Sequence, residues 1–390
     1  MAQLNLEGFK NKKGALVLSG GVVKAAAWHL GVALALEELG FVLKNNHTED
    51  SELNISTYVG SSAGSLIGLL FAAGYGPLDI IEANVDRKNS KMPPITYKDI
   101  LSLKTPLKKP PKTDFYEPLE SFPFFIRKLL SPINRFTGFF TTQGLHDYLV
   151  NNLLQDFNFE DFKSDLFIVA SQLDHSQKSI FGKYNLPSNT FDPTARYVTG
   201  ISVPDAVAAS TAVPPFYCPY PIKNPITKKV EYYFDGEIRD TLSTHVAIDN
   251  KCEYIISSWT HVPYHYHDEI GSLVNYGLPA ICVQAIYQMV EKKIQSHRVR
   301  RRQAKDLIDT LNIFFKENKF DETMRKNLLS IVETKLDFNP RIKLVDIYPK
   351  HSHYKIFLRN SFSLHPQKTA ELVSYGYRRT LAEFKKIEVQ

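Results

Sequence analysis

Two segments near the start of the chain share the same order of apolar and polar positions. Residues 14–18 form a short apolar run that ends at Gly20 and Gly21, and alanine and leucine then dominate up to a further glycine. Residues 54–76 repeat this order, with a β-rich run, a glycine turn and a helical stretch. Because a buried strand, a glycine turn and a helix form one half of a βαβ unit, the pattern predicts two such units in succession.

Later apolar runs have the length and composition of further strands. They cover residues 165–173, 228–236, 253–259 and 343–349. Strands that are separated by helices favour a parallel sheet with helices on both faces. The chain is therefore predicted to have an α/β fold with a central, mainly parallel sheet flanked by helices.

The composition fits a folded protein without stabilising covalent links. The chain has 390 residues, and a hydrophobic share of 43% can fill the core of one large domain or of two ordinary ones. Its three cysteines are Cys218, Cys252 and Cys282, and no two of them have the spacing of a zinc site. Neither a disulfide framework nor a metal site is indicated, so a reducing compartment is expected.

No targeting segment is recognisable at the start of the chain. The first residues lack the apolar core and the small-residue cleavage site of a signal peptide. The longest apolar runs stop short of the ~20 residues that a membrane-spanning helix needs. We expect a cytoplasmic protein that associates with membranes at their surface, and secretion without a cleaved signal stays open.

A basic segment interrupts the α/β pattern. Residues 87–135 contain eleven lysines and arginines against four acidic residues, although the net charge of the whole chain is only +6. Proline pairs and interleaved aromatics accompany these charges. Such a segment is either a proline-rich insertion that packs its own aromatics or an element that docks on anionic lipid. The second interpretation makes these residues candidate membrane contacts: Lys108, Lys109, Lys112, Arg127 and Lys128.

A second basic segment has a helical pattern. It covers residues 289–315, and its charges are concentrated in the first half. A solvated helix face is the favoured interpretation. No nucleic-acid-binding module accompanies either basic segment, so no nucleic-acid partner is expected.

The most informative short motif is Gly60-Ser61-Ser62-Ala63-Gly64, which has the pattern G-x-S-x-G. A nucleophile elbow needs a strand before the serine, a helix after it, and small neighbours that leave the hydroxyl accessible. The flanking residues meet these three conditions. Ser62 is therefore a candidate nucleophile, although a glycine turn that only lets a strand pack on a helix would have the same residues.

Two further stretches carry groups that an ester hydrolase requires. Gly20 and Gly21 lie between a strand and a helix, where unpaired N–H groups can face an oxyanion, and Lys24 adds a cation in the first helical turn. Asp235 follows an apolar run and precedes Gly236, from where its carboxylate can point into a site. An Asp-Gly pair is also a favoured hairpin turn, so this position has two interpretations.

Together these residues resemble the patatin-like phospholipases. The matching signatures are the glycine-rich loop with its basic residue, the G-x-S-x-G elbow and an Asp-Gly pair. Residues 144–149, residues 203–219 and the helical pattern around Gly376 also look like family landmarks. The resemblance covers residues 13–381, within which the basic insertion spans residues 87–140 and a helical segment spans residues 283–335.

The resemblance implies a three-layer fold, an activity and a site. Family members hydrolyse phospholipids or neutral acyl lipids through a Ser–Asp dyad and an acyl-enzyme, without a metal or another cofactor. Carried over to this chain, Ser62 would be the nucleophile and Asp235 the base, as in a phospholipase A or lysophospholipase. The elbow glycines would be Gly60 and Gly64, and the oxyanion hole would be formed by Gly20, Gly21, Val22 and Lys24.

Three positions depart from the family pattern. Val22 stands where the family usually has a third glycine, and Ala25 stands where a glycine follows the basic residue. A β-branched residue disfavours positive φ, so Val22 is expected to restrict the oxyanion loop. Glu237 follows the Asp-Gly pair in place of a small residue, and its charge is expected to raise the pKa of Asp235.

Two other functions compete with the Ser–Asp hydrolase. An esterase with a Ser-Asp-His triad would use a late histidine, for which the candidates are His351, His353 and His365. The other competing function is that of a catalytically weak protein, which binds membrane lipid through the basic insertion. The sequence does not determine the oligomeric state.

Overall fold

The computed structural model describes residues 6–85, 90–104, 123–130, 137–154, 157–187 and 194–388. The candidate membrane contacts Lys108, Lys109 and Lys112 lie outside these ranges, and so does the side chain of Arg127.

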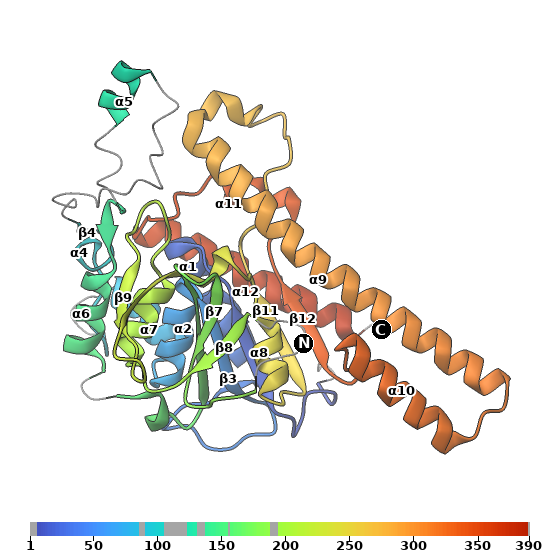
Figure 1. The fold of residues 1–390 in the computed structure, drawn as a ribbon. Coiled ribbons are helices and arrows are strands. Elements are labelled where there is room, and N and C mark those ends of the chain that lie inside the picture. The colour runs from blue at the N-terminus through green and yellow to red at the C-terminus, as the bar shows by residue number, and fades with distance from the viewer. Residues whose placement is uncertain are drawn as a thin grey trace.

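A mainly parallel sheet forms the centre of the molecule (Figure 1). Its strand order is β12-β11-β1-β3-β6-β10-β9, and the neighbours from β12 to β6 are parallel. The antiparallel strand β10 follows β6. The bounds of these strands are β1 Gly14–Leu18, β3 Asn54–Ser61, β6 Asp165–Gln172, β9 Tyr220–Lys223, β10 Val230–Asp235, β11 Tyr254–Ser258 and β12 Lys343–Ile347. The predicted strands and the predicted α/β class are confirmed.

Short strands extend the sheet and form a separate pair. Strand β2 pairs with β3, β7 with β6, and β8 with β7, whereas β4 and β5 form a separate two-stranded sheet. Their bounds are β2 Val42–Leu43, β4 Ser102–Leu103, β5 Phe140–Thr141, β7 Gln177–Phe181 and β8 Ala195–Val198.

Successive side chains of a strand point to opposite faces of the sheet, and each face has its own apolar cluster. In β1, Leu16 and Leu18 belong to the larger apolar cluster, whereas Ala15 and Val17 belong to a second one. Helices α1 (Val22–Glu38), α2 (Ala63–Ala72) and α12 (Pro366–Glu388) contribute to the larger cluster, and α8 (Thr244–Asp249) contributes to the second. The sheet is thus covered by helices on both faces, as expected.

A pair of glycines allows α1 and α12 to cross closely. A Cβ atom on Gly31 would lie 1.9 Å from the Val373 carbonyl oxygen, and one on Gly376 would lie 2.3 Å from that of Trp28. Both helices therefore need glycine at the crossing. The family landmark at Gly376 has this structural explanation.

The remaining helices surround one end of the sheet or project from it. They are α3 Pro77–Val85, α4 Tyr97–Ile100, α5 Phe124–Leu130, α6 Gln143–Asn152, α7 Val203–Ser210, α9 Gly277–Glu317, α10 Glu322–Leu336 and α11 Tyr354–Phe357. Single 3-10 turns cover Phe159–Asp161, Gly236–Ile238, Leu273–Tyr276 and His351–His353. The helix predicted over residues 289–315 is confirmed, and it begins earlier, at Gly277.

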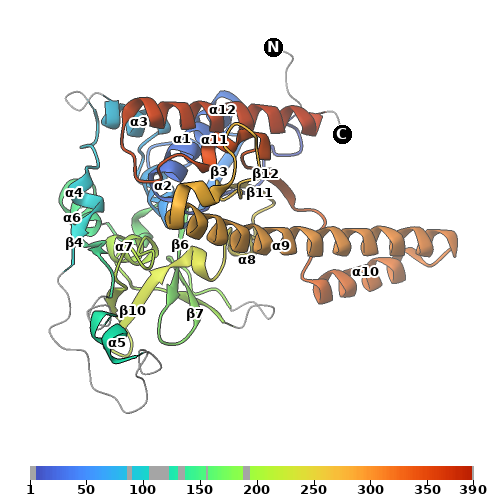
Figure 2. The ribbon, with the colours of Figure 1, turned by 90° about the horizontal axis from the view of Figure 1, so that it is seen from above.

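Helices α9 and α10 form a hairpin that extends away from the sheet (Figure 2). Among the described residues, the stretch Leu273–Glu317 is long enough and apolar enough, by composition alone, to count as a candidate membrane span. The sequence-based expectation of no such run is therefore corrected. One side of α9 nevertheless packs against the protein through Tyr287, Val290 and Ile294.

Candidate active site

Ser62 lies at the sharp turn between β3 and α2. Its φ of 52° and ψ of −127° are strained for a residue with a side chain, as in a nucleophile elbow. A Cβ atom on Gly60 would lie 2.4 Å from the Gly64 carbonyl oxygen, and one on Gly64 would lie 2.2 Å from that of Leu18. Both flanking glycines are therefore required by the turn, and the predicted elbow geometry is present.

A second serine, which the sequence analysis did not single out, supports this turn from α7. The N–H of Ser62 donates to Ser210 Oγ at 2.9 Å, and the Ser210 hydroxyl donates to the Val169 carbonyl oxygen at 2.6 Å. Ser210 is fully buried. Because the contact joins residues 148 positions apart, no local pattern could have predicted it.

The strand register brings Asp235 to the same edge of the sheet as Ser62. Ser61 is level with Val169 on one side of β6, and Asp235 is level with Ala170. After Asp235 the chain enters a 3-10 turn at Gly236, not a hairpin. A Cβ atom on Gly236 would lie 2.4 Å from the Val169 carbonyl oxygen, so close packing explains the Asp-Gly pair. The hairpin interpretation of this pair is wrong.

The carboxyl group of Asp235 is buried and faces the serine. Its Oδ1 accepts the N–H of Glu237 at 2.8 Å, whereas Oδ2 accepts no hydrogen bond of regular geometry from the described residues. Burial raises the pKa of Asp235 to about 7, and the nearby Ser62 hydroxyl opposes that rise. Before substrate binds, the hydrogen bond between a nucleophile and its general base is often poorly aligned.

Glu237 places a second buried carboxyl group beside the first. Its Oε1 accepts the N–H of Gly20 at 2.9 Å, and Oε2 lies 4.0 Å from His261 Nδ1. Burial, followed by the negative charge of Asp235, raises the pKa of Glu237 to about 8. The expectation for this residue is therefore corrected: burial, and not the charge of Glu237, raises the pKa of Asp235, whereas burial and then the charge of Asp235 raise the pKa of Glu237.

The glycine-rich loop adopts the conformation that an oxyanion loop needs. Gly21 has a φ of 129°, and Val22 has a φ of 57°, which a β-branched residue rarely adopts. Among the described residues, the N–H groups of Gly21 and Val22 have no hydrogen-bond partner, whereas the N–H of Gly20 is occupied by Glu237. The loop thus offers two free donors, and it keeps a glycine-like backbone at the cost of strain at Val22.

Lys24 is buried beneath this loop and is directed toward α9. Its Nζ donates to the hydroxyl of Tyr287 at 2.5 Å and lies 4.9 Å from the centre of that ring. The ring of His261 packs edge-on against the same tyrosine. Burial, together with the charge of Lys24, lowers the pKa of His261 to about 3, so the imidazole is neutral. The sequence analysis singled out neither His261 nor Tyr287, because both come from segments far from the motifs.

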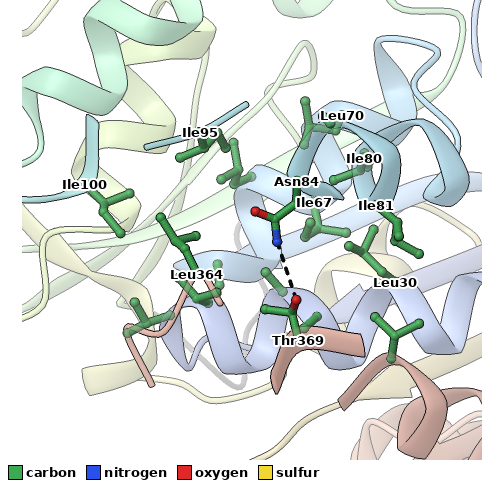
Figure 3. A pocket seen from close by; sticks show the side chains of 18 of the residues that line it. Leu30, Ile67, Leu70, Ile80, Ile81, Asn84, Ile95, Ile100, Leu364 and Thr369 are labelled. Carbon is green, nitrogen blue, oxygen red and sulfur yellow. Dashed lines mark hydrogen bonds between the residues drawn. The ribbon is translucent and has the colours of Figure 1, made fainter. Parts of the chain in front are cut away.

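An apolar pocket of about 340 Å³ opens beside Ser62 (Figure 3). Its walls come from α1, α2, α3 and α12, with aliphatic side chains such as Ile67 and Ile81 facing the cavity. One polar pair crosses it, in which Asn84 Nδ2 donates to Thr369 Oγ1 at 3.4 Å. A concave apolar site with few polar groups is suited to a hydrocarbon chain.

The three late histidines lie in other surroundings. His351 lies 3.9 Å from Glu291, the ring of His353 packs against Tyr375, and His365 is exposed. No contact recorded among the described residues joins any of them to Ser62 or Asp235.

The described part of the chain contains no group of three or more His, Cys, Asp or Glu residues that could hold a metal ion. Of the candidate membrane contacts, Lys128 is exposed on α5, next to the exposed rings of Phe124 and Phe125.

Comparison with known proteins gives one positive finding. The family model described as patatin-like phospholipase matches residues 16–248, which is more than half of the chain. This range contains the glycine-rich loop, the elbow and Asp235, whereas α9, α10 and α12 lie beyond it. No curated protein matches the chain.

Proposed function

The chain belongs to the patatin-like phospholipase family, which makes it an acyl-lipid hydrolase, and we propose that it acts as a phospholipase A or lysophospholipase through a Ser62–Asp235 dyad. One observation carries this proposal: the buried carboxyl of Asp235 approaches the strained Ser62 directly, at the mouth of an apolar pocket. No imidazole is needed between them.

The proposed reaction has two balanced halves. Ser62 Oγ forms a bond to the acyl carbonyl carbon while its proton passes to Asp235. The carbonyl oxygen becomes an oxyanion, which the N–H groups of Gly21 and Val22 stabilise. The ester C–O bond then breaks, and the departing alcohol oxygen takes the proton from Asp235. Water next loses a proton to Asp235 and attacks the acyl carbon, and Ser62 recovers that proton as the fatty acid leaves.

Glu237 imposes a protonation requirement on this reaction. Asp235 must be ionised to accept the serine proton, whereas an ionised Glu237 would place negative charge beside the oxyanion loop at Gly20. Burial and the negative charge of Asp235 both raise the pKa of Glu237, so an ionised Asp235 favours the neutral form of Glu237. Near neutral pH the second carboxyl is thus a neutral acceptor for the Gly20 N–H.

The test combines covalent labelling with product analysis. A fluorophosphonate ester probe should label the wild-type protein but not Ser62→Ala, and Asp235→Asn should label much more slowly. Matched controls are Ser164→Ala, a fully buried serine elsewhere in the fold, and Asp249→Asn, a half-buried carboxyl hydrogen-bonded to Tyr197. Labelling that persists in Ser62→Ala would exclude this serine as the nucleophile.

Product analysis decides the finer assignment. Release of fatty acid from a diacyl phospholipid supports a phospholipase A, and release only from the monoacyl form supports a lysophospholipase. A triad would instead be supported if alanine at His351, His353 or His365 abolished labelling.

A second function is favoured by two features of the oxyanion loop. Val22 holds a strained positive φ, and the Gly20 N–H is already occupied by Glu237. Both features fit a protein that binds acyl lipid but turns it over slowly. Vesicle binding by wild-type protein without release of fatty acid would support this second function.

We also propose that the protein acts in the cytoplasm at the surface of anionic membranes. The lipid substrate, the basic segment at residues 87–135 and the exposed aromatics on α5 support this location.

A further inference from the structure

The outward side of the first turns of α9 carries a row of apolar residues, bordered on one edge by the exposed Gln288. Its members recur at helical spacings of three and four residues, and all are exposed: Leu278, Ile281, Cys282, Ala285, Ile286 and Met289. We call these six residues the α9 stripe. Leu278 is 71% exposed and Met289 is 60% exposed, which is unusual for large apolar side chains that follow one another along one helix face.

The inward side of the same turns is fixed to the protein. Tyr287 packs with Tyr264 and Phe357, and Val290 and Ile294 pack with Trp259. The stripe spans eleven residue steps, which is about 16 Å along a helix, compared with the ~30 Å core of a bilayer. A helix held on one side and apolar over this length is suited to lying at a membrane surface, not to crossing it.

Positive charge follows the stripe directly. Residues 292–305 contain seven lysines and arginines and no aspartate or glutamate. On the outward side of the helix, Lys292 and Arg300 continue the line of the stripe, whereas Lys293 Nζ donates to the Ile238 carbonyl oxygen at 2.5 Å. An apolar face followed by basic turns complements the acyl chains and the anionic headgroups of a phospholipid bilayer.

The turns of α9 that carry the stripe also contact the helix that follows the catalytic loop. Tyr287, on the opposite side of the same turns, accepts a hydrogen bond from the buried Lys24. The beginning of α9 is at the top of the molecule in Figure 1, beyond the sheet and on the same side as α5. A bilayer in contact with the stripe would therefore lie on the far side of α9 from Lys24.

We propose that the α9 stripe docks the protein on an anionic phospholipid bilayer, with the stripe at the boundary of acyl chains and headgroups and the basic turns on the headgroups. This inference rests on the proposed function only for the nature of the surface, which is the lipid substrate itself. It identifies a docking element outside the basic insertion and outside the residues that the family model matches.

The test separates docking from catalysis. Each variant is made in a Ser62→Ala background, so that the lipid is not consumed, and binding is measured by co-sedimentation with vesicles of phosphatidylcholine alone or mixed with phosphatidylserine. The test variant is Ile286→Glu with Met289→Glu. The matched control is Ile313→Glu with Ile331→Glu, which adds the same charge at similarly exposed positions of the α9–α10 hairpin.

The expected results are specific. Each aliphatic side chain removed from the acyl boundary should weaken binding about tenfold, so the double variant should lose about a hundredfold. The control variant should bind like the parent. Lys292→Glu should weaken binding only to the mixed vesicles, by at least about fivefold.

Two outcomes would overturn the proposal. The first is undiminished vesicle binding by the double variant. The second is a dimer in sedimentation velocity without lipid that the double variant abolishes, because the stripe would then be covered by a second copy of the chain. Hydrolysis of a soluble short-chain ester, measured with Ser62 restored, confirms that the double variant folds. If wild-type protein binds vesicles through the stripe but hydrolyses nothing, the dyad fails and the docking surface stands.

Discussion

The buried acid pair makes a sharp prediction about pH. The hydrolysis rate should be bell-shaped, because the active form has Asp235 ionised and Glu237 neutral. Burial raises the pKa of Asp235 to about 7, and burial with the charge of Asp235 raises that of Glu237 to about 8. The substitution that tests this order is Glu237→Gln, since an amide keeps an oxygen acceptor for the Gly20 N–H but cannot ionise.

The magnitude follows from the two pKa values. With apparent values of about 7 and about 8, the active fraction is about 0.6 near pH 7.5 and falls to about 0.1 at pH 6 and at pH 9. In Glu237→Gln the falling limb is absent, so nearly all of the enzyme is active at pH 9. The variant should therefore exceed the wild type about tenfold at pH 9 and differ little from it at pH 6.

The assay is the pH dependence of kcat/KM for a soluble short-chain ester, with the uncatalysed hydrolysis subtracted at each pH. The matched control is Glu231→Gln, which removes a carboxyl from β10, the strand that leads into the turn with Glu237, at a position bonded to Asn224 and Tyr233. A wild-type rate that stays constant between pH 8 and pH 10, or a falling limb that persists in Glu237→Gln, would refute the assigned role of Glu237.

Three further predictions concern stability and binding. The raised pKa of Asp235 means that the folded state binds more protons than the unfolded state between about pH 4 and pH 7, so its contribution to stability falls as pH rises through that window. Asp235→Asn should accordingly raise Tm at pH 8 by more than at pH 5, and an equal gain at both would contradict this. Val22→Gly removes about 1–2 kcal/mol of left-handed strain but adds about 1 kcal/mol of unfolded-state entropy. The free energy of unfolding in urea should therefore change by less than about 1 kcal/mol, and a larger loss would mean that the φ of 57° is not strained. Binding to anionic vesicles should weaken with added salt and with charge reversal at Lys108, Lys109 and Lys112. Binding that does not depend on salt would argue against a role for the basic insertion.

The pattern of neighbouring residues was sufficient to predict the strands and helices, and also the two turns at the glycine-rich loop and at Ser62. The strands, the helices after them and the elbow at Ser62 follow from runs of neighbouring residues, whose apolar spacing and glycines act within a few positions. The position of Asp235 was ambiguous by the same criterion, because an Asp-Gly pair fits a hairpin equally well. Only the register of β10 against β6 distinguishes the two, and that register depends on residues far away in the sequence.

Several groups in the site could not be found from local pattern. Ser210 bonds to the elbow from α7, and Tyr287 bonds to Lys24 from α9. The role of Glu237 was only partly predictable. Its charge could be read beside Asp235, but its bond to the Gly20 N–H and the burial that keeps it neutral depend on how separate segments pack.

The α9 stripe is a second feature that the sequence predicted only in part. The sequence predicted a helix with a basic face, and a regular row of apolar residues along it would normally be assigned to a core. Tertiary packing buries Tyr287, Val290 and Ile294 on one side and leaves the six stripe residues exposed on the other.

By itself the sequence determined the α/β class, the family resemblance, and Ser62 and Asp235 as candidates, because strand, turn and helix preferences act between near neighbours. The tertiary structure decided which groups meet, namely Asp235 with Ser62 and Glu237 with the oxyanion loop. It also decided that the outward side of α9 is exposed to solvent. The physical reason is burial. It changes the pKa of a carboxyl and the cost of an exposed apolar face, and it exists only once distant segments have packed together.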